Sequence, residues 1–302
     1  MSAKKLNTFT LFVLFFAGAI ISGCGSTEGE HQETTTEEVS IQDLEGAAVS
    51  SRKETIKKIF YTIPAPMEMA SLIQSSGADF DKDLLNDVEN ISSYMTQRQK
   101  AINLGVYGAD LSYTTMFERN KESLFYLSAA KKLAEELGVA NIIDDSLISR
   151  VEMNKDQKDS LLNIVSDTFW SLNAKFKEDG MEEVSAMVIT GGWIEALHLA
   201  ISHVEGNDAL RQRIAEQKYS LDDLIKLLAS YEQQDMLGEL SADLEGLQAV
   251  FAEVEINKMK TETSKDENGT MVIGGTKTVT MSDETLAKVV ESIAAIRSKY
   301  IQ

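Results

Sequence analysis

The clearest helical pattern in the chain spans residues 158–180, which read KDSLLNIVSDTFWSLNAKFKEDG. Apolar side chains recur there at intervals of four, four, three and four residues, at Leu161, Val165, Phe169, Leu172 and Phe176. Because an α-helix turns once every 3.6 residues, this spacing places the five side chains along one face. Gly180 follows them, at a position where a glycine commonly ends a helix. The pattern therefore predicts an amphipathic helix that packs its apolar face against a neighbour.

The same spacing recurs through most of the chain. One long helix is predicted from Met236, Leu240, Leu244, Leu247, Phe251 and Val254. Another, which begins at Ser282 or Asp283, is predicted from Leu286, Val289, Ile293, Ile296 and Tyr300. Shorter helices are predicted at residues 51–61, 66–75, 88–104, 107–118, 121–137, 145–153, 182–204, 208–217 and 221–232. Each presents an apolar stripe that must be buried, so we predict an all-α fold built as a multi-helix bundle or array.

A different pattern interrupts the helices near residues 258–281. Strand-prone segments lie on either side of Asn268-Gly269, a dipeptide that favours the tight turn of a β-hairpin. We predict a small β-hairpin appended to the helical body.

The N-terminus carries the features of an export signal. Lys4 and Lys5 precede an apolar run from Phe9 to Ile21, which as a helix rises only about 20 Å and is too short to span a bilayer. The run ends in Ile21-Ser22-Gly23-Cys24, which resembles the lipobox of bacterial lipoproteins. In that family the cysteine is acylated and becomes the new N-terminus. An ordinary signal peptide with a coincidental cysteine, or an uncleaved anchor, are the alternatives.

These features predict three parts of the chain. Residues 1–23 are a lipoprotein signal peptide, residues 24–45 are the lipidated Cys24 with an acidic disordered tether, and residues 46–302 are the helical domain. The tether is assigned from its seven acidic residues and lack of Lys or Arg between residues 25 and 45. In lipoproteins an Asp directly after the cysteine often marks retention at the inner membrane. Gly25 stands there instead, so we expect the outer membrane, with its periplasmic and surface faces both open.

The acidic composition of the chain argues against two classes of binding partner. The formal charge is −19, and loss of the signal peptide would remove Lys4 and Lys5 and no acid. Nucleic acids are bound through cationic contacts to phosphates, so we expect no nucleic-acid partner. Anionic lipid surfaces also attract basic segments, and we therefore expect the membrane contact to be the lipid on Cys24.

Metal sites and cofactor motifs are incomplete. Cys24 is the only cysteine, and lipid would consume its thiol. The calcium-loop pattern that starts at Asp79 has Leu84 where the turn needs Gly and Asn90 where the loop needs Glu. His198 and His203 are five residues apart, which separates them on a helix. We predict no metal and no cofactor.

Two segments carry unusual polar groups within apolar helical sequence. Residues 191–198 read GGWIEALH, and residues 103–113 read NLGVYGADLSY. If the segments face each other, a ligand-binding cleft is predicted that is lined by Tyr107, Asp110, Tyr113, Trp193, Glu195 and His198. The alternative is close helix packing in which buried hydroxyl and carboxyl groups satisfy one another.

The body also resembles a known group of proteins. The segments at residues 63–68, 103–113, 158–162 and 191–195 are similar to those of uncharacterised helical lipoproteins of diderm bacteria, over most of residues 55–230. The resemblance implies the helical fold and the lipid anchor, but no activity. We therefore predict a non-catalytic, lipid-anchored envelope protein that binds a small ligand or a protein partner. The alternative is an envelope hydrolase that depends on carboxylates such as Asp110 and Glu195.

Overall fold

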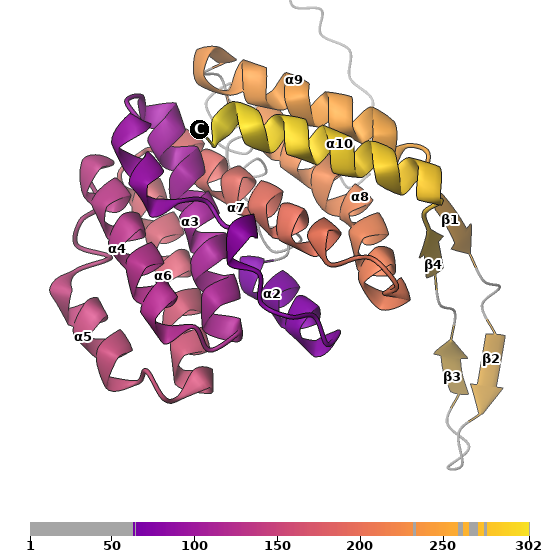
Figure 1. The fold of residues 1–302 in the computed structure, drawn as a ribbon. Helices are drawn as coiled ribbons and strands as arrows, with labels where there is room; N and C mark the ends of the chain where they lie inside the picture. Colours follow the sequence, from indigo (N-terminus) through magenta and orange to yellow (C-terminus); the bar gives the residue numbers. More distant parts are fainter. Residues whose placement is uncertain are drawn as a thin grey trace, which may run out of the picture. The chain divides into compact units, whose positions relative to one another are not determined.

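The computed structural model describes residue 63 and residues 65–231, 234–258, 262–265, 271–274 and 277–301. All of them belong to one compact unit of the chain, Ala47–Gln302. The predicted signal peptide, Cys24, the tether and the helix at residues 51–61 lie outside the described residues. Within them the fold is all-α with a small β-hairpin, as predicted (Figure 1).

The helices follow one another with short connections. In chain order they are α2 (Pro66–Ser75), α3 (Gln97–Met116), α4 (Asn120–Glu136), α5 (Asp145–Met153), α6 (Lys158–Glu178), α7 (Glu182–Ser202), α8 (Asp208–Ala229), α9 (Gln234–Phe251) and α10 (Asp283–Tyr300). Two short 3-10 turns, η1 (Lys82–Leu84) and η2 (Val88–Ser93), lie between α2 and α3. The helix predicted from residues 158–180 is α6, with Leu161, Leu172 and Phe176 buried.

The sequence predicted two breaks between helices that the structure does not contain. Helices predicted at residues 88–104 and 107–118 are η2 followed by one continuous α3, which runs through Gly105 and Gly108. Packing against α7 holds Gly105 in the helix despite its poor helix propensity. Residues 208–217 and 221–232 form the single helix α8. Its apolar stripe is interrupted by Gln217, which is buried because its amide bonds a side chain of α7.

The closest helix contact is between α3 and α7. A Cβ added to Gly105 would lie 1.9 Å from the backbone oxygen of Val188, and one added to Gly191 would lie 2.0 Å from that of Ile102. The two backbones therefore touch where only glycine fits. α7 is apolar and long enough to cross a membrane, but 94% of its most apolar window is buried inside the protein. It is the central helix of the core.

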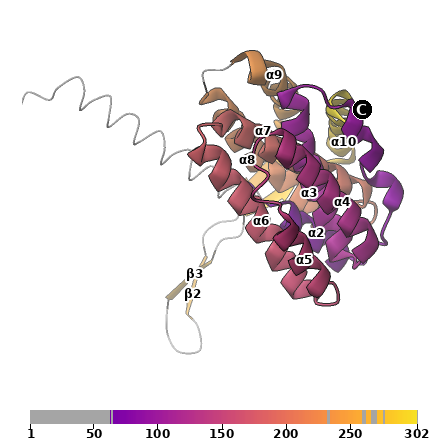
Figure 2. The same cartoon turned by 90° about the vertical axis from the view of Figure 1, so that its left-hand side faces the viewer.

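The other helices pack around this pair. On one side α4 and α6 pack against α3, with α5 close to them in both views (Figures 1 and 2). On the other side α8 packs against α7 and α9, and α10 packs against α7 and α9. α2 contacts both α3 and α7.

The start of α10 agrees with its predicted cap. The helix begins at Asp283, and the Ser282 hydroxyl accepts the Thr285 N–H at 3.0 Å. This bond satisfies one of the free N–H groups at a helix start. The predicted stripe faces the core through its last four members, Val289, Ile293, Ile296 and Tyr300.

The hairpin consists of two antiparallel strand pairs. β1 (Glu255–Lys258) pairs with β4 (Lys277–Thr280), and β2 (Glu262–Lys265) pairs with β3 (Met271–Gly274). It begins three residues before the predicted start at 258, and the predicted turn at Asn268-Gly269 lies outside the described residues. β4 packs against α8, and Val279 is buried.

The α3–α7 contact predicts the effect of two matched glycine substitutions. Gly105→Ala should destabilise the protein by about 1–3 kcal/mol, because the new methyl group would force the two backbones apart. Gly108→Ala, three residues along α3, has no atom within 4 Å of its Cβ. It should leave stability unchanged or raise it by up to about 1 kcal/mol through helix propensity. Urea unfolding of both variants measures the difference, and equal free energies of unfolding would contradict the proposed contact.

Candidate functional site

The α3–α7 contact brings the two predicted segments together. Asp110 on α3 and Glu195 on α7 are both fully buried, and their carboxyl groups interact directly. The predicted proximity of the two segments thus appears in the structure at this pair.

The other four predicted residues point to different partners. Trp193 donates from Nε1 to Gln217 Oε1 on α8 at 3.1 Å. Tyr107 donates to the backbone oxygen of Asp87 at 2.9 Å. The Tyr113 hydroxyl lies 2.9 Å from Nε2 of His203.

His198 lies beside the carboxyl pair at the edge of the core. The imidazole is partly buried, and its Nε2 is 3.2 Å from the backbone oxygen of Leu84. Burial is the main cause that lowers the pKa of His198, with Glu195 opposing it. The ring therefore stays neutral to lower pH than an exposed histidine.

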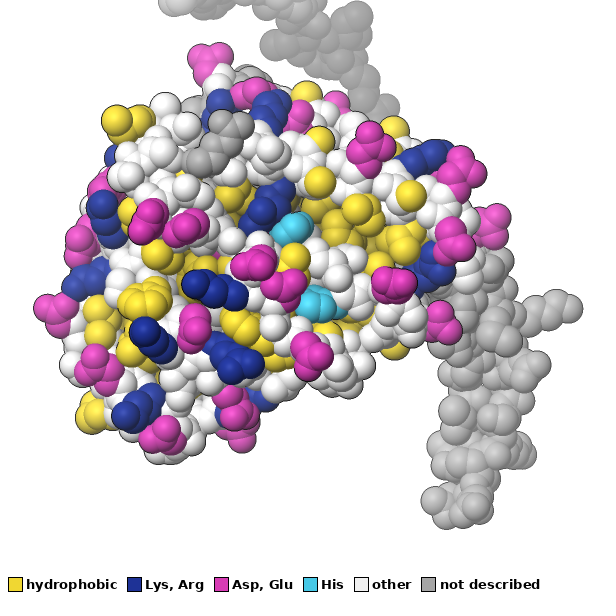
Figure 3. All heavy atoms as spheres, viewed as in Figure 1, with side chains coloured by type: hydrophobic (Ala, Val, Ile, Leu, Met, Phe, Trp, Pro, Cys, Tyr) yellow, Lys and Arg dark blue, Asp and Glu magenta, His cyan; other side chains and the backbone are white. Residues whose placement is uncertain are grey.

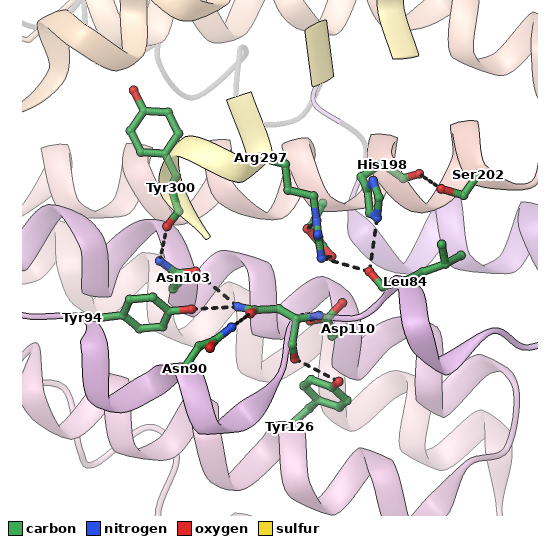
Figure 4. Close-up of polar contacts among 12 residues, drawn as sticks. Leu84, Asn90, Tyr94, Asn103, Asp110, Tyr126, His198, Ser202, Arg297 and Tyr300 are labelled. Carbon is green, nitrogen blue, oxygen red and sulfur yellow. Dashed lines mark hydrogen bonds and ion pairs between the residues drawn. The ribbon is translucent and has the colours of Figure 1, made fainter. Parts of the chain in front are cut away.

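Arg297 of α10 neutralises one of the two acids. Its Nε donates to Glu195 Oε2 at 2.7 Å, and its terminal nitrogen donates to Glu195 Oε1 at 2.8 Å. The same terminal nitrogen donates to the Leu84 backbone oxygen at 2.9 Å (Figure 4). Such a two-point contact fixes both the distance and the orientation of the guanidinium. It ties α10 and the end of η1 to α7.

Asp110 has no cation of its own. The backbone N–H of Asn86 donates to its Oδ2 at 3.2 Å, and its Oδ1 has no partner among the described residues. Burial, followed by the charge of Glu195, raises the pKa of Asp110 well above its ordinary value, while Arg297 opposes the shift. A raised pKa favours the protonated, neutral form of the Asp110 carboxyl group.

Asn86 joins this pair to a wider polar network (Figure 4). Its backbone oxygen accepts from Tyr126 at 3.1 Å, and its side-chain nitrogen donates to Tyr94 at 3.0 Å. Asn103 of α3 donates in turn to the backbone oxygen of Tyr300 at 2.9 Å. The irregular segment between η1 and η2 is thereby held in the core with its polar groups satisfied.

None of the six predicted residues lines either of two cavities found among the described residues. Asp110 and Glu195 are both 0% exposed, so a substrate does not reach them in this conformation. Within the described ranges no group of three or more His, Cys, Asp or Glu side chains is arranged to hold a metal ion.

A cavity lies elsewhere in the helical body. It has a volume of about 70 Å³ and is lined by residues of α3, α4, α5 and α6, together with Pro66 and Met67 of α2 and Val188 of α7. We call it the α4/α6 cavity. Its walls are mainly apolar, among them Leu104, Leu111, Leu127, Ile164, Phe169 and Leu172. A single water needs only about 10–15 Å³, but apolar walls offer water no hydrogen bonds, and such cavities stay dry. The space is suited to an apolar group.

Sequence reasoning missed both Arg297 and this cavity. Arg297 follows Ile296 and lies four residues after Ile293, so it flanks the buried stripe of α10, and that spacing was the available signal. The cavity had no comparable signal, because its lining residues have the same spacing as an ordinary packed face.

Comparison with known proteins yields no relative. No protein-family model, curated protein or solved structure matches the chain. Functional inference therefore rests on the geometry of the site and on the sequence.

The carboxyl pair predicts how stability depends on pH. The pKa of Asp110 is raised in the folded state above its ordinary value of 3.8. At pH values between the ordinary pKa and the raised pKa of Asp110, the folded state binds more protons than the unfolded state. The free energy of unfolding therefore falls as pH rises through that interval. Asp110→Asn removes this titration. The free energy of unfolding of the variant, relative to that of the native protein, should therefore rise by at most about 1.4 kcal/mol per pH unit above pH 4. Parallel curves of unfolding free energy against pH would show that Asp110 titrates normally.

Proposed function

We propose that this protein is a non-catalytic protein of the cell envelope that is anchored by lipid in the outer membrane, and that its body binds a small apolar ligand. The α4/α6 cavity carries the ligand part of the proposal. The sequence Ile21-Ser22-Gly23-Cys24 carries the anchor, through lipid on Cys24.

Three hydroxyl groups of the cavity wall are occupied by bonds within the protein. Ser112 donates to the Gly108 backbone oxygen at 2.8 Å, Ser123 to that of Arg119 at 3.0 Å, and Thr168 to that of Ile164 at 2.7 Å. These hydroxyls are thus bonded to the backbone of their own helices. The wall that remains for a ligand is mainly hydrocarbon. Such a wall favours an apolar group by about 25 cal/mol per Å² buried.

Two other functions fit the structure less well. A hydrolase that uses Asp110 and Glu195 would need substrate to enter a closed polar network. A charged protein partner would need a surface of one sign, but acidic and basic side chains are interspersed over the face shown in Figure 3. The cavity is the feature that neither alternative explains.

Lipidation is tested at Cys24. Cells that express the native chain and the Cys24→Ala variant are fed an alkyne fatty acid, and the two proteins are compared for label. The native protein should be labelled and retained with membranes, because two or more acyl chains hold a protein stably in a bilayer. Cys24→Ala should lose both properties, and equal labelling of the two proteins would refute the anchor.

Ligand binding is tested by xenon NMR of the mature chain carrying Cys24→Ala, because a xenon atom is small enough for a cavity of about 70 Å³. The xenon chemical shift should change when the atom enters the cavity. Gly108 lines the cavity and has open space around its Cβ, so Gly108→Phe should fill it and abolish the change. Gly246 on α9 is exposed and also has open space. Gly246→Phe is therefore the matched control, and equal loss in both variants, or no change at all, would contradict the proposal.

A further inference from the structure

Helix α5 forms part of the wall of the α4/α6 cavity and lies at the edge of the helical body (Figure 1). Leu147 and Val151 line the cavity, and they are the buried residues of α5. Ile143, two residues before the helix, lines the cavity as well. Deeper parts of the wall, such as Leu127 of α4 and Ile164 of α6, are buried. A ligand reaches these side chains only past an outer element of the wall.

Few interactions hold α5 to the rest of the body. α4 and α6 pack along α3, whereas α5 has no such extended contact with any other described element. Among the described residues, one side chain of another helix bonds to α5: Lys131 of α4 donates from Nζ to Asp145 Oδ1 at 2.5 Å. Asp145 is exposed, and exposed ion pairs stabilise a structure only weakly. α5 is therefore the least firmly held helix of the cavity wall.

The side of α5 that faces α6 is not closely packed. An open hollow of about 240 Å³ lies there, between Arg150 and Asn154 at the end of α5 and Asp167 on α6. The chain beyond each end of the helix is exposed, at Asp144 and at residues 155–157. Segments with few buried apolar side chains and few bonds open locally while the rest of a fold stays intact. α5 can thus move without unfolding the core.

We infer that α5 is a lid of the α4/α6 cavity, which moves away from α4 and α6 to admit a small apolar ligand and then closes over it. Closure returns Leu147 and Val151 to the cavity wall, and the ion pair between Lys131 and Asp145 stabilises the closed position. The ligand contacts these two apolar side chains only when α5 is closed, so binding favours closure. This inference rests on the proposed function, since it adds the entry route of the same cavity.

The test ties α5 to α4 in the mature Cys24→Ala protein, which contains no other cysteine. Lys131→Cys and Asp145→Cys are introduced together and bridged by a short bismaleimide whose spacer contains a disulfide. Xenon NMR then measures the rate at which xenon exchanges between solvent and the cavity. The bridge should slow this exchange about tenfold or more, because a lid that cannot open limits entry. Reduction of the spacer should restore the original rate.

A matched bridge and two single variants serve as controls. Lys299→Cys with Asp243→Cys joins α10 to α9 at a similar ion pair, 2.7 Å long, and neither residue lines the cavity, so xenon exchange should not change. Lys131→Gln should speed exchange about two- to fivefold, the range for loss of an exposed ion pair. Lys175→Gln breaks an ion pair within α6 and should leave the rate unchanged.

The outcomes separate this inference from the proposed function. If xenon gives no shift change in the unbridged protein, the proposed function fails together with this inference. If xenon binds but exchanges as fast with the α4–α5 bridge as with the α9–α10 bridge, the cavity remains a binding site and the lid is refuted. Equal slowing by both bridges would also refute the lid, because the motion that admits xenon would then not be that of α5.

Discussion

Gly105 on α3 and Gly191 on α7 let two helix backbones touch, and the placement of the buried carboxyl groups follows from that contact. Any side chain at either position would meet a backbone oxygen at about 2 Å. Close approach brings Asp110 and Glu195 into one apolar core, where two like charges are costly. The core compensates in two ways: Arg297 pairs with Glu195, and burial raises the pKa of Asp110, which favours its protonated form.

The hydrogen bonds around the two carboxyl groups also hold other parts of the chain in place. α10 is held through Arg297, and the segment from Leu84 to Asn86 is held by bonds to Arg297, Asp110 and Tyr126. The bond from Tyr126 extends this polar network to α4. The α4/α6 cavity lies outside the network, since none of these residues lines it.

The sequence predicted most of the fold from its periodicity. The start of α10 at Ser282-Asp283 was predictable because a capping serine coincides with the beginning of an apolar stripe. The continuity of α3 was not, because Gly105 weakens a helix locally and is retained only for its contact with Val188 of α7. The continuity of α8 was missed for a related reason, since Gln217 replaces an apolar residue and is satisfied by Trp193.

The candidate site was partly predictable. Acids within glycine-containing apolar helices indicated that Asp110 and Glu195 needed partners, and the structure brings the two together. Their cation could not be predicted, because Arg297 is 102 residues from Glu195 and its position depends on the packing of α10. The cavity could not be predicted either, since periodicity shows which face is buried but not how completely it is filled.

The central claim, that the α4/α6 cavity admits a small apolar ligand, is tested most directly by NMR of the mature Cys24→Ala protein with labelled methyl groups. Xenon is added under pressure, because it is small enough for a cavity of about 70 Å³, and changes in the chemical shifts of the methyl groups are recorded. Shift changes should appear at Leu127 and Ile164, which line the cavity, and not at Leu240 and Leu247 in the buried face of α9. Shift changes that avoid Leu127 and Ile164, or that spread evenly over surface methyl groups, would contradict the account.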